Sequence, residues 1–454
     1  AVKPQRPRQP APTSELLRNP ERADDGQLRR RARWLAIASI LLPGTAQLVA
    51  GNRRMARLGT ILVFINFLLA IAATALFFLN RTILFSLLTN QLALFALAGY
   101  FFIAAAVVVL INLDTLRLLR LARLPARYRL VPISVLIIAT LVGGGLAFQL
   151  GSVTAAQATL ISQVFAGTGE FNSAVGRYNI LLLGADAGKK RIGIRPDSIS
   201  VLSINSETGK IVNIGIPRNL QRVPFSDQSP MRSEHPDGFN CGVECLINAI
   251  YMDAEENHPE LYPRAAETGS TPGIEATRDA VEGVTGLEIH GFVMVDMAAF
   301  ASLVDALGGV TIDVREALPI GGKEAEDGTL VGVKDWLEVG EQHLDGYHAL
   351  WYARSRAGNS DYDRMARQRE VEAAILKQVE PMTLFFRYQN LASAGKKLIK
   401  SDIPATALGP LLDLAIRARS QGIEDLDLVP PVVNVAWPDF EEIREIISAK
   451  LATD

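Results

Sequence analysis

Four apolar stretches occupy the first third of this 454-residue chain, and they restrict its fold more than any other feature. A helix that crosses a bilayer needs about 20 apolar residues, each rising ~1.5 Å. The last three stretches are long enough, whereas the first is shorter and is interrupted by Pro43 and Gly44. The sequence therefore predicts an N-terminal helical transmembrane region over residues 34–150, with stretches at residues 34–50, 58–79, 92–113 and 131–150.

Arginines between the stretches predict the orientation of this region. Four lie in residues 29–33, three in residues 53–57 and five in residues 117–129, whereas residues 80–91 contain only Arg81. Because positive charge favours the cytoplasmic side, the three clusters are predicted to be cytoplasmic and residues 80–91 external. Residues 34–50 must then form a re-entrant or interfacial hairpin beside three true spans. A fourth span at residues 34–50 is the alternative, and it would place one arginine cluster on the outer face.

Composition predicts the remaining regions. Residues 1–33 are rich in Pro and Arg, which is typical of a disordered basic tail, here cytoplasmic. Residues 151–176 are small and polar and predict a stalk, followed by an extracytoplasmic domain over residues 177–454. The chain is thus expected to be a multi-pass protein of the cell membrane. Its net charge of −2 gives no support for a nucleic-acid partner.

Charged residues in the external domain lie at the ends of three strand-like runs, residues 180–183, 198–204 and 211–216. Asp186 follows the first run, Arg195 and Asp197 surround the start of the second, and Arg218 follows the third. Ligands of α/β sheets collect at strand ends. Two carboxylates and two guanidinium groups there predict a divalent metal beside a phosphate.

Strands and helices alternate after these runs and predict a mixed α/β sandwich. Strands are expected at residues 292–295 and 310–314, and helices at residues 245–255, 277–284, 297–307, 345–354 and 361–379, with an irregular insertion at residues 219–240.

A second charged cluster surrounds the start of the last of these helices. Arg354 and Arg356 end the preceding helix, and Asp361 is expected to cap the next one. Arg364, Arg367 and Gln368 have the i, i+3, i+4 spacing that puts side chains on one helix face. The helix start is therefore predicted to present cations to an anion, aided by the helix dipole.

Several motifs in a fixed order give the chain a family resemblance. They are LLGADA, RPDS, SIN and IPRN within residues 182–219, GFVMVDMAAFASLVDALGGVTIDV at 291–314, LDGYHALWYARSR at 344–356 and DYDRMARQR at 361–369. Together they resemble the LytR-CpsA-Psr (LCP) family of cell-wall phosphotransferases from Gram-positive bacteria and their relatives. The resemblance implies transfer of a glycopolymer from a polyprenyl-pyrophosphate carrier to a peptidoglycan hydroxyl, forming a phosphodiester and releasing polyprenyl phosphate.

The resemblance also implies roles for individual residues. Asp186 and Asp197 match the family's ligands for Mg²⁺ (or Mn²⁺). Arg195, Arg218 and Asp197 are expected to be catalytic, and the pyrophosphate is expected to bind Arg195, Arg218, Arg354, Arg356, Arg364 and Gln368. Apolar residues between the sheet and its helices would line a channel for the polyprenyl tail. Asn219 departs from the family, which usually has Asp there, and the polytopic anchor is unusual.

Cys241 and Cys245 could form a disulfide outside the cytoplasm or remain inert thiols, whereas zinc is less favoured because four ligands are needed and His235 is their only near companion. The five histidines, His235, His258, His290, His343 and His348, form no recognisable proton relay, so the sequence indicates no general base.

Two other functions remain open. The protein could be a regulatory or attenuator membrane protein that holds polyprenyl pyrophosphate without turnover, or a metal-dependent lipid pyrophosphatase in which water replaces the acceptor hydroxyl. Intact Asp186 and Asp197 favour the transferase over simple binding, because anion binding needs the arginines but not the metal carboxylates.

Overall fold

A computed structural model of the protein describes residues 18, 21, 23–165, 167, 171–173, 176–185, 195–324, 329–355, 360–378 and 399–453. The chain divides into two compact units. One consists of residues Ala1–Leu84 and Leu92–Ala155, and the other of residues Phe85–Gln91 and Ala156–Asp454. Two of the predicted site residues, Asp186 and Arg356, lie outside the described residues.

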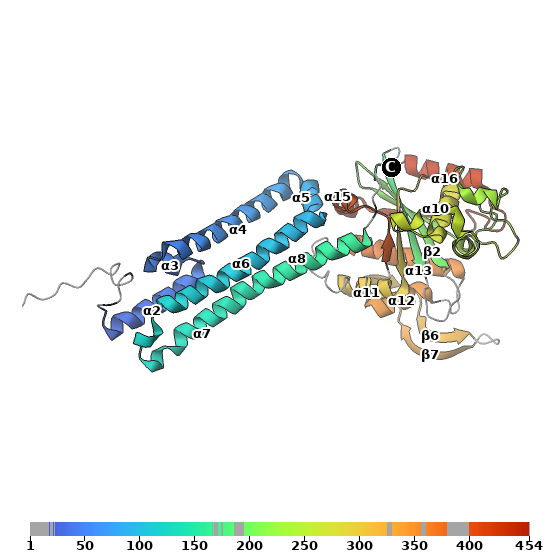
Figure 1. The fold of residues 1–454 in the computed structure, drawn as a ribbon. Helices are drawn as coiled ribbons and strands as arrows, with labels where there is room; N and C mark the ends of the chain where they lie inside the picture. The colour runs from blue at the N-terminus through green and yellow to red at the C-terminus, as the bar shows by residue number, and fades with distance from the viewer. Residues whose placement is uncertain are drawn as a thin grey trace, which may run out of the picture. The chain divides into compact units, whose positions relative to one another are not determined.

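The first unit is helical (Figure 1). Its elements, some of which continue into the second unit, are α2 (Asp25–Leu41), α3 (Thr45–Ala50), α4 (Arg53–Leu79), α5 (Arg81–Thr89), α6 (Gln91–Leu118), α7 (Leu130–Ala139), a π-helical turn (Thr140–Gly144) and α8 (Gly145–Val164). Within the described chain, three helical segments are long and apolar enough to cross a membrane: Arg53–Leu79, Gln91–Arg123 and Ala126–Val164. They contain the three predicted spans.

The segment expected to be re-entrant forms a helix–turn–helix. Gly44 adopts φ 96° between α2 and α3, a conformation that glycine reaches without steric cost. The fully buried Gln47 donates hydrogen bonds of 2.8 Å to the Ile111 carbonyl and to Thr115 Oγ1 of α6. Buried polar groups need such partners, so α3 is fixed to one helix of its own unit.

Residues 151–164 of the predicted stalk continue α8 as regular helix. This stretch contains Ala, Gln, Leu and Ile beside its small polar residues, and most of these side chains favour helix over a flexible linker.

The second unit is built around a six-stranded mixed sheet of order β10-β3-β2-β1-β4-β9. These strands are β1 (Arg177–Ala185), β2 (Pro196–Asn205), β3 (Ile211–Ile216), β4 (Gly291–Asp296), β9 (Ile399–Ser401) and β10 (Ile423–Asp427). β2 is antiparallel to both β1 and β3, whereas β1 and β4 are parallel. Two further ribbons pair β5 (Val310–Val314) with β8 (Gly340–Leu344), and β6 (Leu318–Glu324) with β7 (Leu330–Leu337).

Helices cover both faces of the sheet (Figure 1). On one face, α9 (Ile250–Glu256), α10 (Pro272–Thr285) and α16 (Phe440–Ala452) pack against alternate sheet residues such as Leu181, Val201 and Ile214. On the other face, α15 (Ala405–Gln421) and α13 (Asp361–Gln378) contact Ile180, Leu202 and Ile204. With α11 (Met297–Leu307) and α12 (Gly346–Arg354) beside α13, the predicted mixed α/β sandwich is confirmed.

The helix expected at residues 245–255 begins later than predicted, at Ile250, after a 3₁₀ turn at Ile247–Ala249. The reason lies in the backbone donors. Ile247 N–H bonds the Leu220 carbonyl at 2.9 Å and Asn248 N–H bonds the Arg218 carbonyl at 3.3 Å, so neither is available to a helix.

Candidate active site

A cavity of about 310 Å³ lies between the sheet and helices α11, α12 and α13. Its volume is at the lower end of the range of small-molecule sites, about 300–1,000 Å³. Most of its wall is apolar and is formed by Leu182, Leu183, Ala185, Leu202, Val293, Val295, Met297, Phe300, Leu303, Leu350, Ala353, Ile375 and Leu376. Such a wall suits a hydrocarbon ligand.

Charged and polar side chains complete the lining. They are Asp197 and Ser198 from β2, Asp296 from the end of β4, Arg354 from the end of α12, and Gln368 and Glu372 from α13. Three of the predicted site residues, Asp197, Arg354 and Gln368, are therefore brought to one cavity although they lie far apart in sequence.

Sheet register explains the position of Arg218 beside Asp197. Ile199 pairs with Ile216 in the antiparallel β2–β3 ladder, so residues 197 and 218 leave the ladder at the same edge. Arg218 Nη1 donates to Asp197 Oδ1 at 2.7 Å, and the two side chains are only 23% and 18% exposed. A charge-assisted bond in this partly buried place holds Arg218 against Asp197, which lines the cavity.

The other predicted arginines differ in their surroundings. Arg195 is exposed, two residues before Asp197. Arg354 is exposed, and its guanidinium carbon lies 5.3 Å from the centre of the Trp351 ring, within the range of a cation–π contact. Arg364 is 2% exposed and precedes Gln368 by one helical turn.

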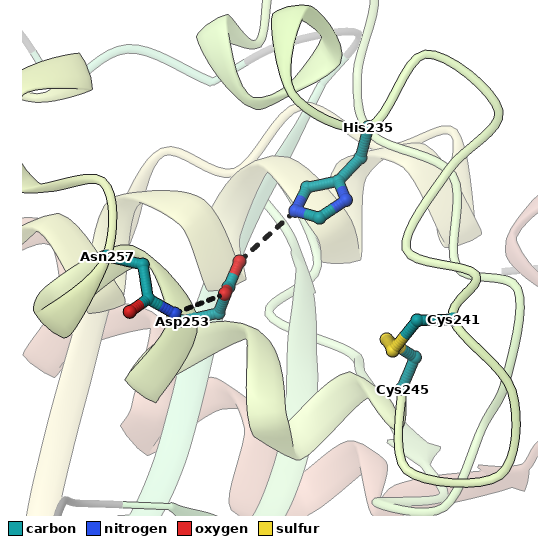
Figure 2. The surroundings of a disulfide bond; sticks show 5 residues. All are labelled: His235, Cys241, Cys245, Asp253 and Asn257. Atoms are coloured by element: carbon teal, nitrogen blue, oxygen red, sulfur yellow. Dashed lines mark hydrogen bonds and ion pairs between the residues drawn. A yellow bond between two sulfur atoms is a disulfide. The ribbon is translucent and has the colours of Figure 1, made fainter.

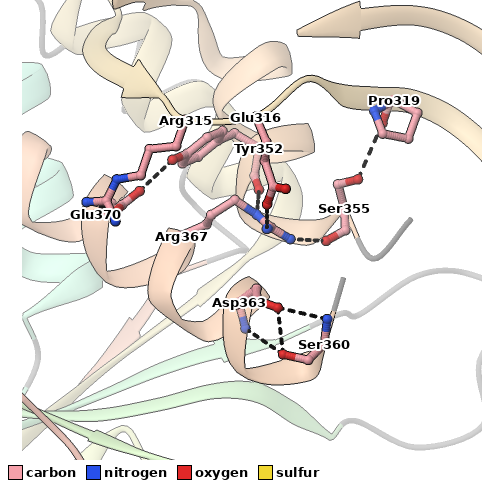
Figure 3. A network of polar contacts seen from close by, with 9 residues as sticks. All are labelled: Arg315, Glu316, Pro319, Tyr352, Ser355, Ser360, Asp363, Arg367 and Glu370. Carbon is pink, nitrogen blue, oxygen red and sulfur yellow. Dashed lines mark hydrogen bonds and ion pairs between the residues drawn. The ribbon is translucent and has the colours of Figure 1, made fainter. Parts of the chain in front are cut away.

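Arg367 does not share the predicted anion-facing role. Its Nε donates to the Tyr352 carbonyl at 3.1 Å and its Nη2 to the Ser355 carbonyl at 2.5 Å (Figure 3). These carbonyls belong to the end of α12, where backbone acceptors lack helical partners. Burial lowers the pKa of the Arg367 guanidinium. The prediction that Arg367 faces an anion is wrong: the side chain fixes the end of the helix that carries Arg354.

The N-terminal cap of α13 is Ser360, where the sequence predicted Asp361. Ser360 Oγ accepts the Asp363 N–H at 3.2 Å, and Asp363 Oδ2 accepts the Ser360 N–H at 2.9 Å (Figure 3). These reciprocal bonds form a capping box in which Ser360 is the cap. The bonds from Ser360 lower the pKa of the Asp363 carboxyl.

Glu372 is a cavity residue that the sequence analysis missed. Its Oε2 accepts from Asn213 Nδ2 at 3.3 Å and Ser200 Oγ at 3.4 Å, and burial raises its pKa to about 7. It follows Gln368 by four residues, a spacing that repeats the one from Arg364 to Gln368. That periodicity along one helix face could have revealed it.

Cys241 and Cys245, left open from the sequence, are joined by a disulfide with 5.2 Å between their Cα atoms. Neither cysteine lines the cavity, and the disulfide lies in the loop between β3 and α9 (Figure 2).

Comparison with known proteins finds relatives in sequence and in structure. The chain is 25% identical over 258 residues to "Polyisoprenyl-teichoic acid–peptidoglycan teichoic acid transferase TagU" of Halalkalibacterium halodurans, covering 56% of this chain and 70% of the relative. It is 26% identical over 236 residues to "Biofilm regulatory protein A" of Streptococcus mutans, covering 50% of each. The crystal structure of Bacillus subtilis TagV aligns with a TM-score of 0.44 and 21% identity, covering 62% of this chain and 99% of that one.

A family comparison covers the α/β unit as well. Residues 152–434, well over half of the chain, match the LytR_cpsA_psr family. This match includes the sheet, the cavity and every described residue of the predicted site. The chain belongs to the LytR-CpsA-Psr family.

Proposed function

We propose that the protein transfers a glycopolymer from a polyprenyl-pyrophosphate carrier to a hydroxyl of peptidoglycan. The observation that carries this proposal is one cavity whose wall is apolar and whose polar lining includes Asp197, Arg354 and Gln368. A carrier lipid has the matching character, because a hydrocarbon chain ends in a strongly anionic pyrophosphate. The name of the TagU relative, a transferase acting between polyisoprenyl-linked teichoic acid and peptidoglycan, supports the same reaction.

In this proposal the apolar wall binds the first isoprene units and the guanidinium groups bind the pyrophosphate. Arg218 and Arg354 are the described arginines beside the cavity lining, and Arg195, Arg356 and Arg364 are assigned by their motifs. Bidentate guanidinium contacts fix the orientation of phosphate oxygens better than point charges do. Asp197 holds Arg218 in place and so limits the side-chain motion that binding would otherwise have to restrict.

The proposed reaction exchanges one phosphorus–oxygen bond for another. An acceptor hydroxyl loses its proton and attacks the sugar-side phosphorus, the anhydride bond breaks, and its electron pair leaves with polyprenyl phosphate. Negative charge on the equatorial and leaving oxygens is stabilised by the arginines. Water is kept from the anhydride by the apolar wall, which favours transfer over hydrolysis.

Mg²⁺, or Mn²⁺, fits the donor chemistry of this proposal. Asp197 offers a hard carboxylate at the cavity, and Asp186 would be the second ligand. When bound, the ion would neutralise pyrophosphate charge as a Lewis acid.

The proposed setting is the outer face of the cell membrane. The three apolar helices of the first unit would anchor the chain, and the α/β unit would meet both lipid-linked substrate and peptidoglycan outside the cytoplasm.

The test uses the full-length protein in detergent with a short-chain polyprenyl-pyrophosphate sugar and peptidoglycan fragments, with and without Mg²⁺. We expect metal-dependent release of polyprenyl phosphate together with sugar phosphate on the peptidoglycan. Release without transfer would identify a pyrophosphatase. Tight binding without release would instead support a regulatory protein, a role in keeping with the name of the Streptococcus mutans relative.

A further inference from the structure

A cluster of two histidines and one aspartate lies between β3 and β4, outside the proposed transfer site. One ligand atom from each of His235, Asp253 and His258 lies within 4.8 Å of the other two. His235 Nε2 is 3.1 Å from Asp253 Oδ2, and the two imidazole rings meet edge to face with their centres 6.1 Å apart. None of the three residues belongs to the cavity lining.

We propose that His235, Asp253 and His258 bind one divalent transition-metal ion, with Zn²⁺ as the best fit. Neighbouring ligand atoms of a tetrahedral zinc site are about 3.4 Å apart when the bonds are ~2.05 Å. The distance of 3.1 Å between His235 Nε2 and Asp253 Oδ2 is close to this value, so the larger adjustment is an approach of His258 to the other two ligands. Two imidazoles and a carboxylate suit zinc, whereas Mg²⁺ prefers oxygen ligands alone. Three protein ligands leave a fourth position for water.

The first ligand is held in place by its surroundings. The backbone N–H of His235 donates to the backbone carbonyl of the fully buried Met231 at 2.9 Å. Its ring stacks on Phe225 and meets Phe239 edge to face, with centre distances of 6.1 and 5.1 Å. A fixed ring costs little entropy on binding, which favours affinity.

The second ligand is oriented by a neighbour. Asn257 Nδ2 donates to Asp253 Oδ1 at 2.9 Å, which leaves Oδ2 directed at His235 (Figure 2). Hydrogen bonds of this kind commonly orient metal-binding carboxylates. Asp253 lies in α9, and Asn257, four residues later, is its C-terminal cap. The buried residues Ile250 and Tyr251 of α9 fix this helix in the core.

Charge also favours a cation at this point. Glu260 Oε1 lies 3.9 Å from His258 Nδ1, so a second carboxylate is close enough to balance a doubly charged ion. The metal would join the turn at residue 235 to α9, next to the segment that Cys241 and Cys245 close.

The chain provides a matched control elsewhere. His348 Nδ1 lies 2.7 Å from Asp345 Oδ1, and Asp345 also caps α12. This is a histidine–aspartate pair of similar geometry, but it is not among the groups of three ligand residues found in the described chain. It tests whether an isolated pair is enough to bind the metal.

The experiment titrates chelator-treated full-length protein with Zn²⁺, and with Co²⁺ as a spectroscopic probe, in millimolar Mg²⁺ that occupies any oxygen-ligand site. We expect one Zn²⁺ per chain and the intense visible absorption of four-coordinate Co²⁺ with nitrogen donors. His258→Ala and Asp253→Asn should each weaken binding at least about 100-fold, since even loss of an orienting group costs roughly 10–100-fold. Asn257→Ala should weaken it about 10-fold, and His348→Ala should change nothing.

Thermal midpoints of the metal-free variants check that each is folded, and Zn²⁺ should raise the midpoint of the unmodified protein but not that of His258→Ala. The proposal is overturned if the unmodified protein binds no Zn²⁺ when protein and metal are equimolar. It is also overturned if the Co²⁺ spectrum shows no coordination by nitrogen. Equal affinity in His258→Ala, Asp253→Asn and His348→Ala would overturn it as well. Transfer activity plays no part in these readouts, so they are independent of the proposed function.

Discussion

Two arginine–aspartate pairs of similar geometry have different surroundings in this molecule. Arg218 Nη1 lies 2.7 Å from Asp197 Oδ1, the two side chains are 23% and 18% exposed, and Asp197 lines the cavity. Arg232 and Asp227 also form an ion pair, but they are 46% and 98% exposed. An exposed pair contributes little to stability and, away from a ligand, has no group to orient. Surroundings, and not the residue types, make the first pair the candidate for the proposed function.

Arg218→Ala should reduce transfer by about 100- to 1,000-fold, the usual cost of losing one group that stabilises transition-state charge. The thermal midpoint should stay within a few degrees, because the side chain lies at a strand end and contributes little to the core. Arg232→Ala is the matched control and should keep full activity. Equal loss in both variants, or no loss in Arg218→Ala, would remove Arg218 from the proposed mechanism.

Glu372 should make stability depend on pH. Burial raises its pKa from 4.5 to about 7, so the folded chain keeps the proton over a range in which the unfolded chain releases it. This contribution to stability is present below about pH 4.5 and is lost as the pH rises to about 7. Between pH 5 and pH 8 the unmodified protein should lose about 1–3 kcal/mol of its unfolding free energy through this group. In Glu372→Gln this part of the loss should be absent, which unfolding measurements on both proteins at the two pH values would show. An identical pH dependence in both proteins would contradict the buried carboxyl.

At the scale of elements, the end of α12 combines two arginines with separate tasks. Arg354 is exposed and lines the cavity, whereas Arg367 reaches back from α13 to the carbonyls of Tyr352 and Ser355. One side chain is available to a ligand, and the other fixes the helix that presents it. Their shared charge and their motifs do not separate these tasks, but their hydrogen bonds do.

This division predicts opposite outcomes for two substitutions. Arg367→Ala leaves two buried carbonyls without a partner and should lower the free energy of unfolding by about 2–3 kcal/mol. Arg354→Ala should leave that free energy nearly unchanged and reduce turnover. Chemical denaturation and the transfer assay, run on both variants, measure the two effects. A large stability loss in Arg354→Ala with none in Arg367→Ala would reverse the assignment.

Elements buried on both faces were predictable from the sequence. The runs around β1, β2 and β3 match their strands closely, since continuous burial produces continuous apolar sequence. The β6–β7 ribbon was not predicted. Much of β7 is exposed and Gly321, Gly322 and Gly332 have positive φ, so the apolar alternation that identifies a strand is absent. The contacts of Arg367 and Ser360 were not predicted either. Those of Arg367 depend on packing between helices, and those of Ser360 depend on a local cap.

At the scale of the whole molecule, the apolar helices and the α/β unit have separate roles in the proposed function, anchoring and chemistry. Within the helical unit, Leu28 and Leu35 of α2 pack against Leu119 and Leu124, which lie in the arginine-rich stretch after α6. Arg31 Nη1 also donates to the Leu118 carbonyl at 2.8 Å. Two arginine clusters that the sequence assigned to the cytoplasm are thus brought to the same end of this unit.

Cysteine labelling in cells should therefore separate three spans from four. The two native cysteines are joined in a disulfide, so the maleimide can react with an introduced cysteine but not with them. Asn80→Cys should react with a membrane-impermeant maleimide in intact cells, whereas Asp25→Cys should react only after the membrane is opened. Reaction of Asp25→Cys in intact cells would mean that residues 34–50 cross the membrane.

The central claim is that a phosphate group moves to peptidoglycan, and the most direct measurement follows that phosphorus. The carrier would be synthesised with radiolabelled phosphorus at the sugar-side position of its pyrophosphate and given to the full-length protein with peptidoglycan fragments and Mg²⁺. The account predicts that the label becomes covalently attached to the peptidoglycan while unlabelled polyprenyl phosphate is released. Label recovered only in free sugar phosphate, or only in the intact bound carrier, would contradict it.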